Sequence, residues 1–230
     1  MRDQTAPRLD LSALSSGLPL GEAVFRVLRH ALREGVYRPG DRLREEEIAR
    51  ELNVSRTPIR EAFGRLQSKR LIEPSGTKGL VVRTLDMTEV LELYAMREIL
   101  EGAAARLAAQ HASPSEFEAL DDLLIAFEAH LGDAAEMARL NRLFHNGIIR
   151  AARNRYLETV LDELQDGIAL LGATTFSVAE RPGTAVAEHR AMLNAIRERE
   201  SEQAEKLAST HIREALRARL KLLHAAGASR

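Results

Sequence analysis

The 230-residue chain contains no cysteine and no long apolar run. Without cysteine it has neither a disulfide nor a thiolate metal site, and a reducing compartment suits such a chain. No uninterrupted apolar stretch approaches the ~20 residues of a membrane-spanning helix, and the first twenty residues lack the apolar core of a secretion signal. The sequence therefore predicts a cytoplasmic protein with no membrane partner.

The chain carries a net charge of only −1, but its two parts differ in sign. Residues 1–85 contain 16 Lys and Arg against 11 Asp and Glu, whereas residues 86–230 contain 17 against 23. A basic part in a neutral chain is a weak sign of a nucleic-acid partner. The length allows two domains with sizeable cores. We expect a flexible tail over residues 1–18, a basic domain over 19–85 and a second domain over 86–230.

A helix-turn-helix pattern begins at Glu45. Ile48 and Leu52 lie four residues apart on one face of a short helix, and Asn53 suits the left-handed turn that ends it. Ser55 can then cap a second helix that begins about two residues later, with a proline tolerated in its first turn.

The second helix has an apolar stripe and a polar stripe. The apolar stripe predicts core contacts, and its members are Ile59, Ala62, Phe63 and Leu66. The polar stripe consists of Thr57, Arg60, Gly64 and Ser68. Short side chains let a backbone enter a major groove about 12 Å wide, where the arginine can donate two hydrogen bonds to a guanine. Taken alone, this stripe fits a surface helix with a solvated arginine as well.

A two-stranded wing is predicted after the second helix. Residues 71–73 and 80–83 have extended patterns, and a turn rich in proline, serine and glycine separates them. Upstream, a turn signal over residues 37–41 precedes a short extended segment. Two strands beside a helix-turn-helix are the arrangement of a winged helix-turn-helix.

The turn and second helix read Val54-Ser55-Arg56-Thr57-Pro58-Ile59-Arg60-Glu61-Ala62. With the wing pattern, residues of roughly 20 to 85 resemble the winged helix-turn-helix of the GntR family of bacterial transcription regulators. The resemblance implies contacts with operator phosphates and bases, with the wing turn in the minor groove, by Arg42, Ser55, Arg56, Thr57, Arg60, Gly76, Thr77, Lys78 and Gly79. The sequence departs from the family at Lys69-Arg70, where a glycine usually follows the second helix. This arginine must adopt the left-handed region or end the helix differently.

From about residue 88 onward every periodic segment is helical. Helix starts are marked by Asp86 or Thr88, by a capping box with proline over residues 113–116, and by Asp133. Three further helices are expected over about residues 154–176, 184–199 and 201–224. The second domain is therefore predicted to be an all-α bundle of six or so helices, and the whole fold to be mainly α.

Histidines on three of these helices could meet. Asn141 and His145 lie four residues apart on one helical face, while His189 and His211 lie on two later helices. Three neutral imidazoles and one oxygen suit zinc and its neighbours. On spacing alone, hydrogen-bonded core or surface histidines explain the pattern at least as well.

The segments Asn141-Arg142-Leu143-Phe144-His145, Glu188-His189 and His211-Ile212 resemble the FCD effector domain of the FadR subfamily of GntR regulators. The resemblance implies a divalent metal at the floor of a ligand cavity, zinc first and nickel or manganese as alternatives, held by Asn141, His145, His189 and His211. Asparagine stands here where aspartate is usual. Because an amide oxygen carries no charge, a weaker or differently selective site is expected.

Arg97 is the residue expected to bind an effector. An arginine at this place in the FCD pattern lies near the cavity and can form a bidentate pair with a carboxylate. The alternative is a solvated arginine paired with Glu101, which would stabilise the helix by only ~0.3–0.5 kcal/mol. A metal on neutral ligands together with Arg97 would leave two buried cations without an anion, which is costly. A small carboxylic acid effector is therefore expected.

The sequence as a whole predicts a homodimeric, ligand-responsive transcription regulator that binds a palindromic operator in double-stranded DNA and is not an enzyme. Two alternatives stay open. A metal-dependent hydrolase could hold a water on the histidines, although no carboxylate in these motifs is evidently placed as a general base. A dedicated metal sensor would use the metal as its signal.

Overall fold

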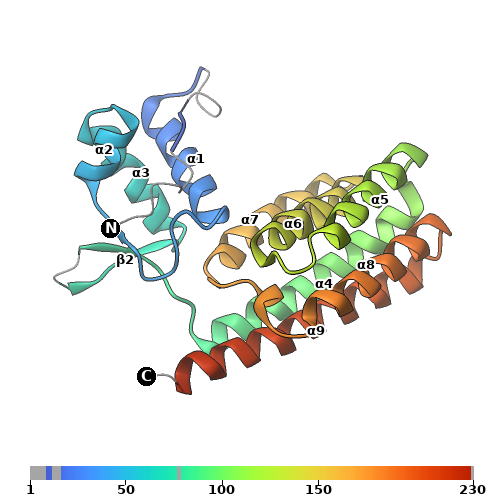
Figure 1. The fold of residues 1–230 in the computed structure, drawn as a ribbon. Helices are drawn as coiled ribbons and strands as arrows, with labels where there is room; N and C mark the ends of the chain where they lie inside the picture. The colour runs from blue at the N-terminus through green and yellow to red at the C-terminus, as the bar shows by residue number, and fades with distance from the viewer. Residues whose placement is uncertain (1–8, 12–16, 77–78, 229–230) are drawn as a thin grey trace. The chain divides into compact units, whose positions relative to one another are not determined.

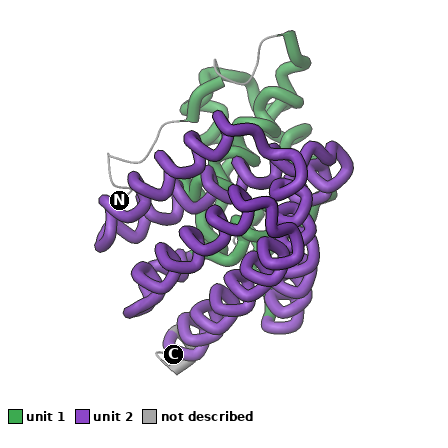
Figure 2. Tube along the Cα trace, turned by 90° about the vertical axis from the view of Figure 1, so that its right-hand side faces the viewer, with its two compact units in different colours: residues 1–86, 165–172 green, residues 87–164, 173–230 purple. Residues whose placement is uncertain are grey.

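The computed structural model describes residues 9–11, 17–76 and 79–228 of the chain. Backbone contacts divide the chain into two compact units, coloured in Figure 2. Unit 1 comprises residues 1–86 with 165–172, and unit 2 comprises residues 87–164 with 173–230. Among the described residues, no helix is both long and apolar enough to cross a membrane.

Unit 1 combines three helices with a small antiparallel sheet (Figure 1). Its elements are α1 (Leu20–Arg33), β1 (Arg42–Leu43), α2 (Glu45–Leu52), α3 (Arg56–Ser68), β2 (Ile72–Pro74) and β3 (Leu80–Val82). The strand order is β1-β3-β2, so the wing predicted with two strands has a third. The third strand forms because Arg42 pairs with Val81 and Leu43 pairs with Leu80.

The core of unit 1 lies between α1 and α3. The apolar positions of α1 at helical spacing are buried, and the apolar stripe of α3 faces them. The fully buried members include Val24, Leu28, Ile59 and Leu66. The predicted stripe of α3 is therefore confirmed as the face that packs on the rest of the domain.

Two left-handed residues end the helices of the helix-turn-helix. Asn53 has φ 53° after α2, as its residue type predicted. Arg70 has φ 55° after α3, so the arginine adopts the left-handed region, one of the two outcomes expected for it. The helix end is nevertheless closed, because the Leu71 N–H donates to the Leu66 carbonyl at 2.9 Å. The α3 helix begins at Arg56, slightly earlier than predicted.

Unit 2 is helical throughout its described part, as predicted. Its elements are α4 (Met87–His111), α5 (Pro114–Ala129), α6 (Ala134–Ala151), α7 (Arg155–Ala169, whose last residues group with unit 1), the 3-10 turn η2 (Thr175–Ser177), α8 (Arg181–Arg197) and α9 (Ser201–Ala228). The α4 and α9 helices pack side by side in opposite directions (Figure 1). Gly102 permits this close approach, since a Cβ there would lie 2.6 Å from the Ser209 hydroxyl.

The predicted helix starts at Ser113 and Asp133 are confirmed. Ser113 and Glu116 form the reciprocal capping box of α5, and the Asp133 carboxylate accepts from two backbone N–H groups of α6. The single helix expected over 154–176 is wrong, because α7 ends at Ala169. Gly172 then adopts φ 74°, and a 3-10 turn follows.

Candidate metal centre and nucleic-acid interface

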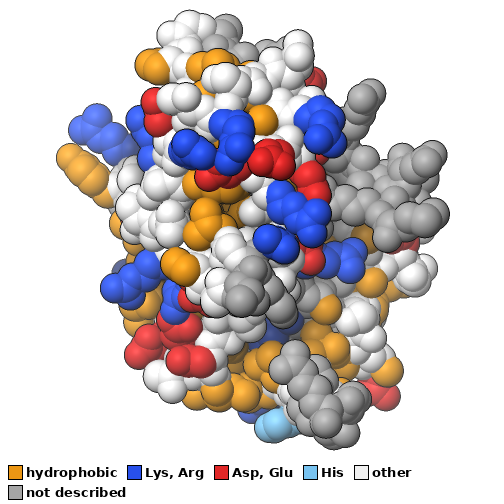
Figure 3. Space-filling model, turned by 90° about the vertical axis from the view of Figure 1, so that its left-hand side faces the viewer, with side chains coloured by type: hydrophobic (Ala, Val, Ile, Leu, Met, Phe, Trp, Pro, Cys, Tyr) orange, Lys and Arg blue, Asp and Glu red, His pale blue; other side chains and the backbone are white. Residues whose placement is uncertain are grey.

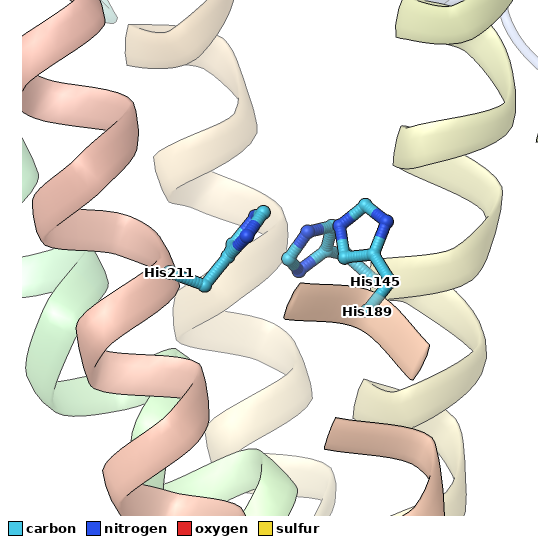
Figure 4. A group of neighbouring side chains, drawn as sticks. All are labelled: His145, His189 and His211. Atoms are coloured by element: carbon cyan, nitrogen blue, oxygen red, sulfur yellow. The ribbon is translucent and has the colours of Figure 1, made fainter. Parts of the chain in front are cut away.

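Three helices of unit 2 bring three histidines together. His145 comes from α6, His189 from α8 and His211 from α9, and Figure 4 shows their rings close to one another. One ring nitrogen of each lies within 4.8 Å of those of the others. All three side chains are buried, with exposed fractions of 7%, 0% and 3%. The three histidines named from the sequence thus form one cluster inside the bundle.

Several buried polar atoms of this cluster have no hydrogen-bond partner. They are Nε2 of His145 and both ring nitrogens of His189. Oδ1 of Asn141, which lies one turn before His145 on α6, is also buried without a partner. A buried polar atom left without a partner costs about 1–3 kcal/mol, so such atoms are rare unless something binds them. Imidazole nitrogens and an amide oxygen are ligands for zinc and related divalent metals. The donor set therefore fits a metal ion.

The environment of His189 and His211 keeps their rings neutral. Burial lowers the pKa of His189 and of His211 well below the ordinary value for histidine. The Phe127 and Phe144 rings pack against His189, with centroid distances of 5.1 Å and 4.7 Å. Neutral imidazole is the form that offers a lone pair to a metal.

A carboxylate that the sequence analysis did not place at the site lies beside His145. Oε2 of Glu101 is 2.8 Å from Nδ1 of His145, at ion-pair distance. Although burial raises the pKa of Glu101, Arg97 and His145 together hold it well below its ordinary value. The resulting anion favours a proton on Nδ1 and leaves the lone pair of His145 on Nε2.

A second carboxylate lies beside His211. Nδ1 of His211 is 2.6 Å from Oε2 of Glu188 and 3.3 Å from a terminal nitrogen of Arg181. The same nitrogen cannot both donate to Glu188 and accept from Arg181, and the shorter contact to a carboxylate favours donation. Burial raises the pKa of Glu188 despite the opposing charge of Arg181, which donates to it at 2.8 Å. Nε2 of His211 is then the nitrogen left for a metal.

Arg97 is neither solvated nor unpaired. Its Nε donates to Oε1 of Glu101 at 2.8 Å, and the two side chains are 10% and 7% exposed. The expectation that no anion lies beside Arg97 is therefore wrong, because Glu101 faces it; Glu188 likewise faces Arg181. The four-residue spacing of Arg97 and Glu101 was visible in the sequence, but their burial was not. No sequence pattern indicated that Arg181, at the start of α8, lies at this site.

The residues of α3 and its N-cap that are predicted to contact DNA are exposed. The polar stripe of α3 is exposed along its length, at Thr57, Arg60, Gly64 and Ser68. Ser55 and Arg56 are exposed at its start. Ser55 occupies the N-cap position, but its hydroxyl makes no capping hydrogen bond.

Acidic residues of α2 engage the arginines of α3. Nε of Arg60 donates to Oε2 of Glu45 at 2.8 Å, and Nη2 of Arg56 donates to the same oxygen at 3.1 Å. Nη1 of Arg56 donates to Glu46 at 3.0 Å. On the face of the molecule drawn in Figure 3, Lys and Arg side chains lie among Asp and Glu side chains.

The wing is closed by two glycines with positive φ. Gly76 and Gly79 have φ values of 44° and 77°, and the Ser75 N–H donates to the Gly79 carbonyl at 2.7 Å. The exposed Arg42 of β1 lies beside this turn, because a Cβ on Gly79 would be 3.9 Å from its Nη2. The predicted contacts of Thr77 and Lys78 fall outside the described residues.

A winged helix-turn-helix followed by a separate helical bundle is the architecture of a two-domain DNA-binding protein. Comparison with known proteins specifies the family. Residues 20–82 match the family described as "Bacterial regulatory proteins, gntR family", and residues 92–214 match the "FCD domain". The chain belongs to the GntR family and carries an FCD domain. It is a DNA-binding transcription regulator and not an enzyme, so the hydrolase alternative has no support.

Relatives and solved structures agree with this assignment. The chain is 28% identical over 190 residues to the HTH-type transcriptional regulator YdhC of Bacillus subtilis, covering 81% of this chain and 85% of the relative. It is 33% identical over 180 residues to a probable D-xylose utilization operon transcriptional repressor of Paenarthrobacter nicotinovorans, with coverages of 75% and 76%. The fold is similar to that of McbR/YncC of E. coli, with a TM-score of 0.78 and 21% identity over 90% of this chain and 99% of that one.

Proposed function

We propose that this regulator binds a palindromic operator as a homodimer and responds to a small carboxylic acid bound at a divalent metal in its FCD domain. The metal ligands would be Asn141, His145, His189 and His211, with zinc the first candidate and nickel or manganese the alternatives. The metal would supply a Lewis-acidic centre for the effector. Effector binding can shift operator affinity only if it favours one arrangement of the DNA-binding domains over another.

One observation carries the metal part of this proposal. The cluster buries ring nitrogens of His145 and His189 without hydrogen-bond partners, and the amide oxygen of Asn141, one turn before His145 on α6, is also buried without one. The two flanking carboxylates, of Glu101 and Glu188, lie on the Nδ1 sides of the histidines beside them. A cluster that served only as a packed core would satisfy these atoms or replace them with apolar groups.

The charges around the cluster support a carboxylate effector. Glu101 and Glu188 are each paired with an arginine, so these four groups balance among themselves. A divalent ion on four neutral ligands would then keep its charge of two, buried in the bundle. An organic acid that places a carboxylate oxygen on the ion would reduce this cost. Arg97 stays our candidate for a second contact with the acid.

An exposed apolar row on α4 supports the homodimer. Met87, Leu91 and Ile99 recur at multiples of four residues and are 42%, 44% and 63% exposed. A row of large exposed apolar side chains on one helix suits contact with a second copy of this chain. We expect Leu91→Glu to give a monomer in native mass spectrometry. Leu143→Glu, at another exposed leucine of unit 2, should leave the dimer intact.

For DNA binding, we propose that Arg60 reads a base and that other residues of the helix-turn-helix and the wing position these two elements. The positioning set comprises Arg42, Ser55, Arg56, Thr57, Gly76, Thr77, Lys78 and Gly79. Arg60 is 62% exposed at its side chain and lies on the same stripe as the short residues that permit close approach.

Native mass spectrometry of the full chain, before and after treatment with a chelator, tests the metal site. We expect a dimer with one metal ion per chain, removed by the chelator and restored by added zinc. His211→Gln should lose the ion, whereas His30→Gln, at an exposed histidine of α1, should keep it. Absence of bound metal, together with a melting temperature that ignores chelator and zinc, would refute the site.

Operator affinity separates the cofactor role from the metal-sensor alternative. The metal-loaded protein should change its affinity when a carboxylic acid is added, and zinc alone should not reproduce this change. A full response to zinc without any acid would identify the metal as the signal.

A further inference from the structure

A single carboxylate oxygen of α2 accepts hydrogen bonds from two arginines of α3, Arg56 and Arg60. Oε2 of Glu45, the first residue of α2, accepts from Nε of Arg60 at 2.8 Å. The same oxygen accepts from Arg56, through Nη2 at 3.1 Å and Nε at 3.3 Å. Although partial burial raises the pKa of Glu45, the two arginines lower it below its ordinary value. The contact is therefore made by an ionised carboxylate.

The two arginines are held in different ways. Glu45 engages only the inner nitrogen, Nε, of Arg60. The two terminal nitrogens of Arg60 lie at the end of the side chain, beyond the nitrogen that Glu45 engages. Such a pair of nitrogens can donate to O6 and N7 of one guanine. Arg56 has all three nitrogens engaged, two with Glu45 and one with Glu46. Arg60 is thus presented for base contact, while Arg56 is held against α2.

We propose that Glu45 determines specificity by fixing the Arg60 guanidinium so that its terminal nitrogens read a guanine. This inference rests on the proposed base contact of Arg60. The side chain of Arg60 is 62% exposed, so little else restrains its long and flexible stem. An arginine already fixed in the reading orientation loses less entropy on binding the correct base. Glu45 is therefore a positioning residue that acts through Arg60.

A simple charge effect would give a different result. Any carboxylate near the DNA repels phosphates, and Glu46 provides the same charge one residue away on α2, in contact with Arg56 alone. If charge were the whole role, Glu45→Gln and Glu46→Gln would have equal effects. If orientation matters, only Glu45 variants should alter the base preference. Glu45→Asp sharpens the distinction, because it keeps the charge but shortens the side chain by one methylene.

Selection from a library of random duplex DNA tests this inference even while the operator sequence is unidentified. The full-length wild type, Glu45→Gln, Glu45→Asp, Glu46→Gln and Arg60→Ala would each be incubated with the library, and the bound DNA sequenced. We expect the wild type to enrich a motif containing a guanine that Arg60→Ala no longer selects. Both Glu45 variants should lose preference at this base pair by about 10-fold or more. Glu46→Gln should retain it.

The affinity of each variant for duplex DNA that lacks the enriched motif measures the effect of charge alone. Glu45→Gln and Glu46→Gln should both bind such DNA more tightly, by similar factors, whereas Glu45→Asp should match the wild type. An unchanged motif in both Glu45 variants would overturn the inference alone. A wild-type motif that survives Arg60→Ala would overturn the base contact of Arg60 and the inference with it. Failure of the wild type to enrich any motif would overturn the operator-binding function itself.

Discussion

Glu101 places a carboxylate oxygen 2.8 Å from Nδ1 of His145, on the side of the ring away from the unpartnered Nε2. The other oxygen of Glu101 accepts from Arg97 at 2.8 Å. A carboxylate behind a histidine fixes the tautomer and the ring orientation and makes the facing nitrogen more basic. Glu101 is thus positioned to support a metal ligand without being one.

Glu101→Gln should weaken metal binding by about 10- to 100-fold, because the amide no longer carries the charge that stabilises the Nδ1–H tautomer of His145. Competition for zinc against a chromogenic chelator measures the affinity directly. Glu98→Gln is the matched control, since Glu98 lies nearly one turn earlier on α4 and pairs with Arg213 on the surface. Equal zinc affinities for wild type and Glu101→Gln would show that Glu101 serves only Arg97.

Asn141→Asp should tighten metal binding. The change adds an anionic oxygen to a neutral ligand set with almost no change of shape. Oδ1 of Asn141 is buried and without a partner in the structure, so an aspartate there without a metal would bury an unpaired charge. We therefore expect a melting temperature below that of the wild type in chelator and above it in excess zinc. A loss of zinc affinity in this variant would remove Asn141 from the ligand set.

The capping box of α5 should make a pH-dependent contribution to stability. The Ser113 backbone N–H and hydroxyl, each 2.8 Å from the Glu116 carboxylate, hold the pKa of Glu116 below its ordinary value of 4.5. A depressed carboxyl pKa stabilises the fold above the unfolded-state pKa, and this contribution is lost as the pH falls through the folded-state value. Glu116→Ala should therefore lower the free energy of unfolding by about 0.5–1 kcal/mol at pH 7 and by less near pH 3.

Urea titrations at the two pH values measure this difference. Glu118→Ala is the control, because Glu118 is exposed on the same helix outside the capping box. An equal loss of stability at both pH values would mean that the charge of Glu116 contributes nothing to the cap.

Local chemistry made the helix-turn-helix predictable from the sequence. Asn53 marked the turn because its side chain tolerates the left-handed region. In the second domain, the start of α5 was likewise predictable, because the two residues of its capping box lie three positions apart. The strand β1 was missed as part of the sheet because two residues are too few to show an alternating pattern. Its partner strand, β3, lies nearly forty residues later in the chain, so no local pattern indicates the pairing.

The supporting residues of the metal cluster could not be predicted in the same way. Glu101 and His145 come from α4 and α6, 44 positions apart, and no local pattern records their contact. Arg181 and His211 are likewise 30 positions apart and meet only through the packing of α8 on α9. The histidines themselves were found through resemblance to the FCD domain, since their spacing alone was compatible with ordinary core positions.

Arg97→Ala is a poor test of effector binding, because it would leave the buried Glu101 without its partner. Removing one member of a buried ion pair costs about 3–5 kcal/mol, and here it would also disturb His145. Arg97→Lys is the sharper variant, since it keeps a cation beside Glu101 but loses the planar fork that binds a carboxylate in bidentate fashion. We expect Arg97→Lys to retain zinc affinity and to lose most of the thermal stabilisation that carboxylic acids give the zinc-loaded wild type.

The measurement is a thermal-shift screen that compares mono- and dicarboxylates, hydroxy acids and sugar acids with neutral and cationic metabolites. If Arg97→Lys responds to the acids as the wild type does, Arg97 serves only to balance Glu101. If no carboxylate stabilises the wild type while neutral compounds do, the class of effector proposed here is wrong.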